Sequence, residues 1–446
     1  MVDHDKNTLL DKIWGCWTGK ISGGMYGSRV EGRTKKFIQK MVPPLTGWIE
    51  THRQQINDDE QYELIALLAL ESLDDAMIKA GKTKHEILSP ELLGRFWKEN
   101  LDRRYVFTAE KAALENAVDH GVPWEHAADE IYENRYQNAY FDWIGAQMKG
   151  ELFGMLAPAS GWHSDQSPTA ENDLKRLRLC VQLSLEDAWI AHRGVGIAGE
   201  LFVSAMVAVG IDFNPIDVKT TITYPAAVKF LARSPLPDRP SKWETIEQHG
   251  VTAEILKSDI VRVKDALLLL DDKRISKPNI AKFYECIDAV VATFELNHDP
   301  RFWEQAWAAA EEASEKYRRE LVDDARQRLS NNKAWLKERL NLLKKDRAFG
   351  VHTVPNNAAI VIGLIYGDGD MFQTMHRATE CGLDTDCNAG NAAAILGAYL
   401  GNKLIPSYEK RFARGEILSP LANWKEMSLQ KLAERTFAQA ERLMDK

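Results

Sequence analysis

Apolar residues recur at helical spacing along most of this chain, as in Leu64, Ile65, Leu67, Leu68 and Leu73. Strand-like alternation bounded by turn residues is hard to find. The pattern therefore predicts an all-α fold. Helices are expected at about residues 9–35, 60–80, 90–100, 108–119, 125–133, 140–155, 168–182, 187–209, 215–232, 242–247, 255–270, 280–294, 300–345, 356–366, 371–380 and 388–401, and in the C-terminal tail.

The stretch 255–348 differs in composition from the rest of the chain, because it is highly charged, rich in helix-forming residues and poor in small residues. We interpret it as an additional helical layer inserted within a single domain that spans 1–446. The alternative is that it simply continues the same bundle.

Composition narrows the function classes. The 446 residues are 45% apolar, which is ample for a large core. The formal charge of −8 offers no basic excess for a phosphate backbone, so bulk nucleic-acid binding is not expected. The five cysteines form no C-x-x-C pair, and the N-terminus lacks an apolar signal-peptide core. We expect no segment of this chain to span a bilayer. These features predict a cytoplasmic protein without a membrane partner.

Glycines at every fourth position mark the first helix. Gly15, Gly19, Gly23 and Gly27 would line one face, and each costs about 1 kcal/mol against alanine in a helix interior. Four glycines in register predict that a second backbone packs closely there. Glu31 follows this helix and could stand at the edge of a cleft, or it could be a surface side chain paired with a nearby arginine.

Two acidic clusters, Asn57–Glu60 and Asp384–Asn388, stand directly before apolar helices. Capping explains part of the pattern, since Asp and Asn are favoured caps and early carboxylates interact well with the helix dipole. Both clusters nevertheless carry two aspartates where one cap would suffice. If the two starts converge, the repulsion among four carboxylates must be relieved by protonation or by cations. Oxygen ligands without a Cys/His set favour Mg²⁺ or Mn²⁺ over zinc.

Four blocks of the sequence resemble the ADP-ribosylglycohydrolases, which include the dinitrogenase reductase-activating glycohydrolases and the crystallin J1-like proteins. The blocks are the opening from Gly15 to Gly32, the pair Asp58-Asp59, the segment from Ala191 to Ala205 that contains His192, and the segment from Gly382 to Gly401. The resemblance covers about 9–230 and 350–403. It implies an orthogonal all-α bundle that holds two Mg²⁺ ions and cleaves the N- or O-glycosidic bond at the anomeric carbon of an ADP-ribosyl group.

The resemblance also assigns roles to residues of this chain. Glu31 is expected to be the general acid or base, with Asp58 and Asp386 also at the reacting centre. The expected metal ligands are Asn57, Asp58, Asp59, Glu60, Asp384 and Asp386. The expected substrate contacts are Gln147, Gly154, His192 and Asn357. The residues alone favour a core histidine for His192, on a helix that begins near Glu186, and the resemblance shifts the interpretation to substrate or phosphate contact.

The sequence departs from the family pattern at two metal-site positions. The family commonly has Ser or Thr hydroxyls just before the first Asp pair and just after the second Asp, where this chain has Asn57 and Cys387. A thiol is a poor partner for Mg²⁺. The Asn57 carbonyl or the Glu60 carboxylate could supply the oxygen, whereas Cys387 could leave one metal position weaker or empty.

Two alternatives to an ADP-ribosyl substrate stay open. The first is a smaller ribosylated metabolite or nucleoside, which is favoured because Lys149 and His163 are the only cations in the stretch expected to bind phosphate, 145–163. The second is a non-catalytic binding protein of the crystallin J1-like type, against which the four aspartates and Glu31 argue. The sequence predicts a small-molecule or ADP-ribosylated partner and leaves the oligomeric state open.

Overall fold

The structure is a computed structural model, and it describes most of the chain. The described residues are 3–41, 58–72, 88–215, 220–223, 245–248, 250–329, 336–406, 416–418, 421 and 426–444. Predictions that fall on other positions, including Asn57 and most of the expected helix at 215–232, lie outside the described residues.

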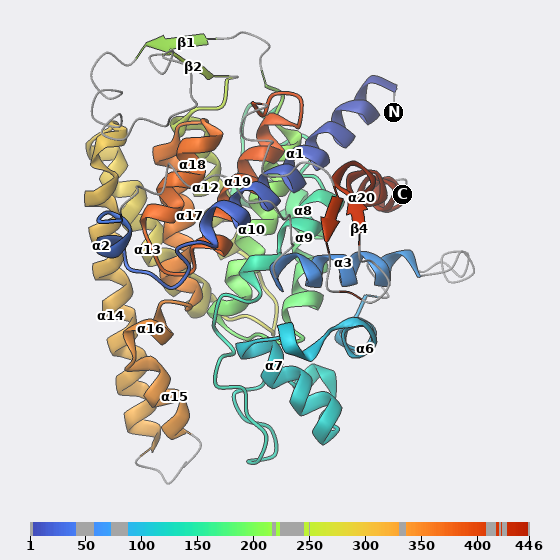
Figure 1. The fold of residues 1–446 in the computed structure, drawn as a ribbon, viewed down its shortest axis with the longest axis vertical. Coiled ribbons are helices and arrows are strands. Elements are labelled where there is room, and N and C mark those ends of the chain that lie inside the picture. The colour runs from blue at the N-terminus through green and yellow to red at the C-terminus, as the bar shows by residue number, and fades with distance from the viewer. Residues whose placement is uncertain are drawn as a thin grey trace.

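Helices make up nearly all of the secondary structure in the described part of the chain, which confirms the predicted all-α class (Figure 1). The α-helices are α1 (Asp3–Gly27), α2 (Lys35–Ile38), α3 (Asp58–Glu71), α6 (Pro90–Asn100), α7 (Thr108–Leu114), α8 (Glu151–Leu156), α9 (Ala170–Ala188), α10 (Val195–Asp212), α12 (Ala253–Leu268), α13 (Lys277–Leu296), α14 (Trp303–Leu329), α15 (Leu336–Leu343), α16 (Asp346–Phe349), α17 (Thr353–Gly367), α18 (Met371–Glu380), α19 (Thr385–Leu400) and α20 (Leu429–Met444). Shorter helical turns are η2 (Arg103–Tyr105), η3 (Glu115–Asp119), η4 (Trp124–His126), η5 (Gln147–Lys149) and η6 (Pro300–Phe302).

Two small antiparallel hairpins complete the described secondary structure. β1 (Thr220–Thr223) pairs with β2 (Thr245–Gln248), and β3 (Glu416–Leu418) pairs with β4 (Glu426–Ser428). The helix expected at 242–247 is therefore wrong, and so is the expected helix at 215–232 over its described residues 220–223, which form β1. β-Branched residues in both strands, such as Ile222 and Ile246, favour an extended ladder over a helix.

Several predicted helix boundaries also differ: the helix expected at 9–35 ends at Gly27, and that expected at 140–155 is reduced to η5 and α8. Two further differences have a visible backbone cause. The expected helix at 187–209 is interrupted between α9 and α10, where Gly194 has a φ of 58° that a helix cannot accommodate. His192 consequently lies in the connection and not on a helix. The expected helix at 125–133 reduces to the single turn η4, and Glu133 and Asn134 beyond it have left-handed backbones.

The centre of the fold is an antiparallel pair, α1 against α19. A Cβ added to Gly15, Gly19, Gly23 or Gly27 would lie 2.0–2.4 Å from a backbone oxygen of α19. The partners run in reverse order, from Gly397 opposite Gly15 to Thr385 opposite Gly27. The close helix contact expected from the glycine spacing is therefore present, and it sets the end of α1 beside the start of α19.

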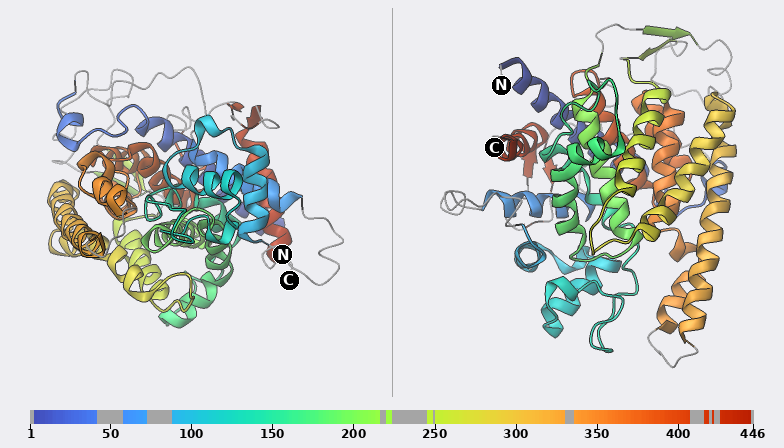
Figure 2. Two further views of the ribbon diagram at one scale, coloured as in Figure 1. Left: turned by 90° about the horizontal axis from the view of Figure 1, so that it is seen from below. Right: turned by 180° about the vertical axis from the view of Figure 1, so that it is seen from behind.

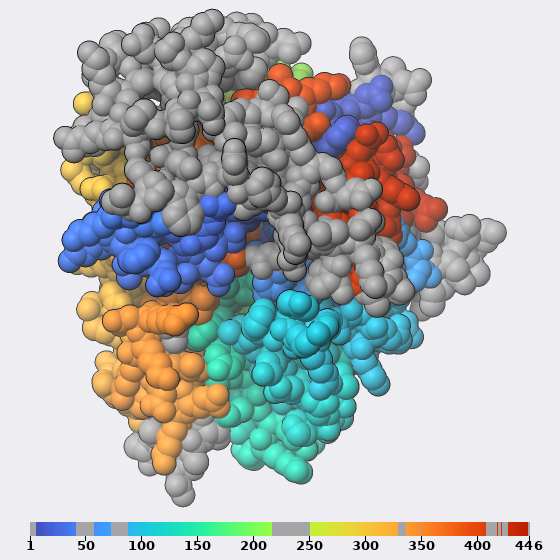
Figure 3. Space-filling model, viewed as in Figure 1, coloured from blue at the N-terminus to red at the C-terminus, as the bar shows by residue number. Residues whose placement is uncertain are grey.

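Other helices surround this pair. α10 packs on both α8 and α19, and α17 and α18 lie beside α19. The long α14 runs along one side of the molecule with α13, as both views show (Figures 1 and 2). The two labelled chain ends lie on the same side (Figures 1 and 2). In space-filling form, α2 (blue) reaches the surface above α15 and α16 (orange) (Figure 3).

Helix α10 is the one described helix long and apolar enough to cross a bilayer. Buried core helices have the same composition, and 94% of its 18 residues are buried inside the molecule. Glu200 is one of these buried residues. All five cysteines lie in the described part, where each is buried and unpaired.

Candidate active site

The junction of α1 and α19 places Glu31 next to the second acidic helix start. The Thr385 hydroxyl donates to the Gly27 carbonyl oxygen at 2.8 Å. Just beyond, the Gly32 amide donates to the Leu383 carbonyl at 2.8 Å, and the Leu383 amide donates back to the carbonyl of Arg33 at 3.1 Å. The segment that carries Glu31 is therefore tied to the first residue of α19 on one side of Glu31 and to the loop that precedes Asp384 on the other.

The acidic cluster at the start of α3 contacts the acidic cluster at the start of α19 through a thiol hydrogen bond. The Cys387 thiol donates to Oδ1 of Asp59 at 3.4 Å. Asp384 occupies the N-cap of α19, but its side chain makes no capping hydrogen bond. Capping therefore does not account for this carboxylate, and the structure brings the two acidic starts to one place.

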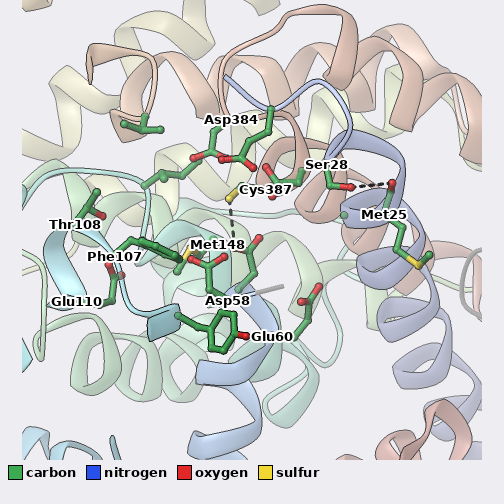
Figure 4. A pocket seen from close by; sticks show the side chains of 18 of the residues that line it. Met25, Ser28, Asp58, Glu60, Phe107, Thr108, Glu110, Met148, Asp384 and Cys387 are labelled. Atoms are coloured by element: carbon green, nitrogen blue, oxygen red, sulfur yellow. Dashed lines mark hydrogen bonds between the residues drawn. The ribbon is translucent and has the colours of Figure 1, made fainter. Parts of the chain in front are cut away.

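A cavity of about 600 Å³ opens at this meeting point (Figure 4). That volume is within the range of small-molecule sites in proteins. None of the described residues that line it is Lys, Arg or His. Seven lining residues are acidic, and they are Glu31, Asp58, Asp59, Glu60, Glu110, Asp384 and Asp386.

Burial and mutual repulsion raise the pKa values of these acids. Burial, reinforced by the charge of Asp386, raises the pKa of Asp58 to about 8. The same two causes raise the pKa of Asp384 well above its usual value. The charge of Asp386, and secondly burial, raise the pKa of Glu31 to about 7. The cluster is thus poised to exchange protons for a bound cation.

One buried lysine partly offsets this negative charge. Lys20 is 1% exposed and lies behind the first acidic start, where its ammonium pairs with Glu151 at 2.9 Å and donates to the Met148 carbonyl. Burial raises the pKa of Asp59 well above its usual value, and the positive charge of Lys20 opposes that rise.

The donor set fits divalent cations. Ligand atoms of Asp384, Asp386 and Cys387 all lie within 4.8 Å of one another. Asp58 and Asp59 approach from α3 across the cavity. Carboxylate oxygens suit Mg²⁺ or Mn²⁺, whereas the thiol is a soft donor that suits neither well. Asn57 lies outside the described residues, and Glu60 lines the cavity beside the aspartates.

The four expected substrate contacts do not line the cavity. Gln147 is fully buried and accepts from the Thr353 hydroxyl at 2.9 Å. A Cβ at Gly154 would lie 2.3 Å from the Ser204 carbonyl oxygen, so this glycine serves the close packing of α8 on α10. His192 is fully buried, with Nε2 3.5 Å from Oε1 of Glu110. These three residues belong to the packed core behind the residues that line the cavity.

Asn357 is also buried and does not line the cavity. The preceding residue, Asn356, instead positions the second acidic cluster. The Asn356 side-chain oxygen accepts from the Asp384 amide at 3.2 Å and from the Asn388 side chain at 2.7 Å. Its nitrogen donates to the Gly350 and His352 carbonyls. Asn356 therefore fixes the start of α19. From the sequence alone, this role could not be assigned to Asn356 in preference to Asn357.

Sequence reasoning missed Glu110, an acid on the cavity wall. It lies on α7 at helical spacing to Ala113 and Leu114, and all three are buried. An acid on the apolar face of a short helix is rare unless it has a function or a partner, and this signal could have identified it.

Lys149 and His163, the only cations in the stretch 145–163, do not point into the cavity. Lys149 is 1% exposed, and its ammonium pairs with Asp187 and lies 3.6 Å from Glu200. His163 lies 3.0 Å from Asp259 and 3.5 Å from Asp212. Both are held in internal ion pairs, and neither lines the cavity.

The fold and this cavity define a class: an all-α protein that gathers carboxylates from helix ends around one small-molecule site. The ADP-ribosylglycohydrolase profile matches residues 5–444, so the chain belongs to the ADP-ribosylglycohydrolase family. A solved structure described as an "ADP-ribosylglycohydrolase-related protein complex" aligns over 98% of this chain and 100% of its own, at 14% identity and a TM-score of 0.45. No curated protein matches the sequence. Family membership indicates a hydrolase of this type, with an acidic site suited to metal.

Proposed function

We propose that the protein is a magnesium-dependent glycosidase that cleaves the N- or O-glycosidic bond at the anomeric carbon of an ADP-ribosyl group. The observation that carries the proposal is the cavity where the end of α1 meets the starts of α3 and α19, with acids from all three in its lining. Family membership supports the ADP-ribosyl class of substrate.

The aspartates of the two acidic starts have the binding role. Asp58 and Asp59 on one side, with Asp384 and Asp386 on the other, would hold two Mg²⁺ ions. Bound ions would fix vicinal ribose hydroxyls and lower the pKa of a water molecule. Asn356 and the Thr385–Gly27 hydrogen bond keep the second start in place. Cys387 would contribute little to a Mg²⁺ site through its thiol.

Glu31 is our candidate for the group that takes a proton from the attacking water. It lines the cavity, and the two residues that follow it, Gly32 and Arg33, are held by backbone hydrogen bonds to Leu383. The charge of Asp386 holds its pKa near 7, and cations on Asp386 would lower that pKa and favour the carboxylate. A carboxylate at this position also stabilises an oxocarbenium-like transition state by charge.

A smaller ribosylated metabolite is the second candidate substrate. The specific observation is that Lys149 and His163 form internal ion pairs, and that none of the described residues lining the cavity is cationic. A pyrophosphate gains most from such cations. The metal site would serve either substrate equally, since both present ribose hydroxyls.

Calorimetric titration distinguishes these candidates. ADP-ribose and simple nucleosides are titrated into metal-stripped protein with and without Mg²⁺, and again into Asp386→Ala and the surface control Asp119→Ala. Metal-dependent ADP-ribose binding that only Asp386→Ala abolishes supports the leading proposal. Nucleoside binding alone moves the assignment to small ribosides. Failure to bind metal overturns the enzymatic proposal in favour of a crystallin J1-like binding protein.

A further inference from the structure

Glu110 is an acid in the cavity wall that the metal site does not use. Its side chain is 2% exposed, it lines the cavity, and Oε1 makes no hydrogen bond within the described part of the chain. Figure 4 places it beside Phe107 and Thr108, on the side of the pocket away from Asp384 and Cys387. A buried carboxyl oxygen without a partner is costly to maintain, so it calls for a role in binding or chemistry.

The surroundings of Glu110 are built to receive its carboxyl group. A Cβ at Gly145 would lie 1.8 Å from Oε1, so only glycine leaves room for the carboxyl there. On the far side, Nε2 of His192 lies 3.5 Å away. Burial lowers the pKa of His192 well below its usual value, so the ring is neutral and cannot hold Glu110 as an ion pair.

The chain that leads into α7 turns Glu110 and its neighbours toward the cavity. Thr108 has a φ of 40°, a conformation that β-branched residues seldom adopt. Phe107, Thr108 and Glu110 all line the cavity. Phe107 is nevertheless 51% exposed, which is unusual for a large apolar ring. Local backbone strain of this kind is concentrated at functional sites.

We propose that Glu110 is a further catalytic residue, the acid that protonates the departing group. This inference rests on the proposed glycosidase activity. The bond from the anomeric carbon to the leaving nitrogen or oxygen breaks, and its electron pair stays with the leaving atom. That atom takes the proton of the Glu110 carboxyl. The oxygen of water bonds to the anomeric carbon, and the proton that the water loses passes to Glu31. One acid loses a proton and the other gains one, as in hydrolysis by paired carboxyls.

The pKa of Glu110 agrees with this role. Burial raises the pKa of Glu110 to about 7, and the charge of Lys149 limits the rise. Lys149 and Asp187, the charged groups that act on Glu110, do not line the cavity. The raised pKa of Asp58, due first to burial and to Asp386, also has a contribution from the charge of Glu110. A glutamic acid with a pKa near the working pH is suited to donate a proton.

The first test compares variants of the full chain with Mg²⁺ on an ADP-ribosylated substrate with an alkoxide or amine leaving group. Glu110→Gln should lower kcat by about 100-fold or more, because general acids typically contribute that much. Gly145→Ala should lower kcat by displacing the carboxyl while keeping its charge. The control Glu115→Gln changes an acid at the exposed end of the same helical segment and should leave kcat unchanged.

The second test separates chemistry from structure. On the 4-nitrophenyl glycoside of ADP-ribose, whose leaving group departs without a proton, Glu110→Gln should retain activity close to wild type. Equal losses on both substrates, or wild-type kcat on both, would overturn the assignment. So would loss of Mg²⁺ affinity in Glu110→Gln. Inactivity of the wild-type protein on every substrate would instead refute the proposed glycosidase function itself.

Discussion

Thr385 and Gly27 are joined by a hydrogen bond of 2.8 Å from the threonine hydroxyl to the glycine carbonyl oxygen. This contact is the last of the series in which the glycine face of α1 lies against the backbone of α19. Because the two helices are antiparallel, the residues that follow Gly27 and those that precede Thr385 emerge together. The packing of two helices thus decides where Glu31 meets Asp384 and Asp386.

The first prediction concerns this helix pair. Gly23→Ala would place a Cβ 2.1 Å from the Ala389 carbonyl oxygen, so the backbones must separate. We expect the free energy of unfolding to fall by about 1–3 kcal/mol, the usual cost of overpacking. The adjacent Gly24→Ala places its Cβ 3.6 Å from Glu60 and should gain about 0.5–1 kcal/mol from helix propensity. Urea unfolding of both variants checks this, and equal stabilities would contradict the close-contact interpretation.

The second prediction concerns the thiol at the proposed metal site. Cys387→Ser replaces a soft donor that lies 3.4 Å from Asp59 by a hard oxygen of similar size. The affinity for Mg²⁺ should rise several-fold in calorimetric titration. Cys180→Ser, a buried thiol outside the cavity lining, is the matched control and should leave the affinity unchanged. A lower affinity in Cys387→Ser would show that the thiol is already the better partner.

The third prediction concerns protons released by the metal. Without metal the pKa values of Asp58 and Glu31 are raised to about 8 and about 7, so both acids are substantially protonated near neutral pH. A cation needs the charged carboxylates, and its binding must therefore expel protons. Mg²⁺ affinity should increase from about pH 6 to about pH 8. Titrations in buffers of different ionisation enthalpy count the protons, and a count of zero at neutral pH would refute the proposed ligand set.

The fourth prediction concerns the stability of the folded chain at alkaline pH. Burial lowers the pKa of Lys12 from 10.5 to about 7, although its ammonium donates to the Tyr399 carbonyl. Between those values the unfolded chain binds more protons than the folded one, so stability rises with pH. The gain should be a few kcal/mol between about pH 7 and about pH 10.

Lys12→Met should remove this rise and be more stable than wild type near pH 7. Lys6→Met alters a lysine that is 46% exposed, and it should keep the wild-type pH dependence. Urea unfolding at several pH values makes the comparison. Parallel stability curves for wild type and Lys12→Met would contradict the buried-lysine explanation.

Local sequence patterns sufficed for the helical class and for one packing contact. Helical periodicity is a local property, and so is the spacing of Gly15, Gly19, Gly23 and Gly27. The acidic pairs at 58–59 and 384–386 could also be recognised, because each exceeds the needs of a helix cap. The resemblance to a known family then indicated that the two pairs belong to one metal site.

Only the tertiary structure decided which residues reach the cavity. Gln147 precedes Met148 of the cavity lining in sequence, yet packing buries it outside that lining, as it does Gly154, His192 and Asn357. Glu110 reaches the lining because Gly145, which comes 35 positions later, leaves room for its carboxyl. The sequence determines which face of a helix is buried, since that depends on neighbours three and four positions away. Which buried polar group faces a cavity depends on contacts between segments far apart in the chain, and these exist only after the helices have packed.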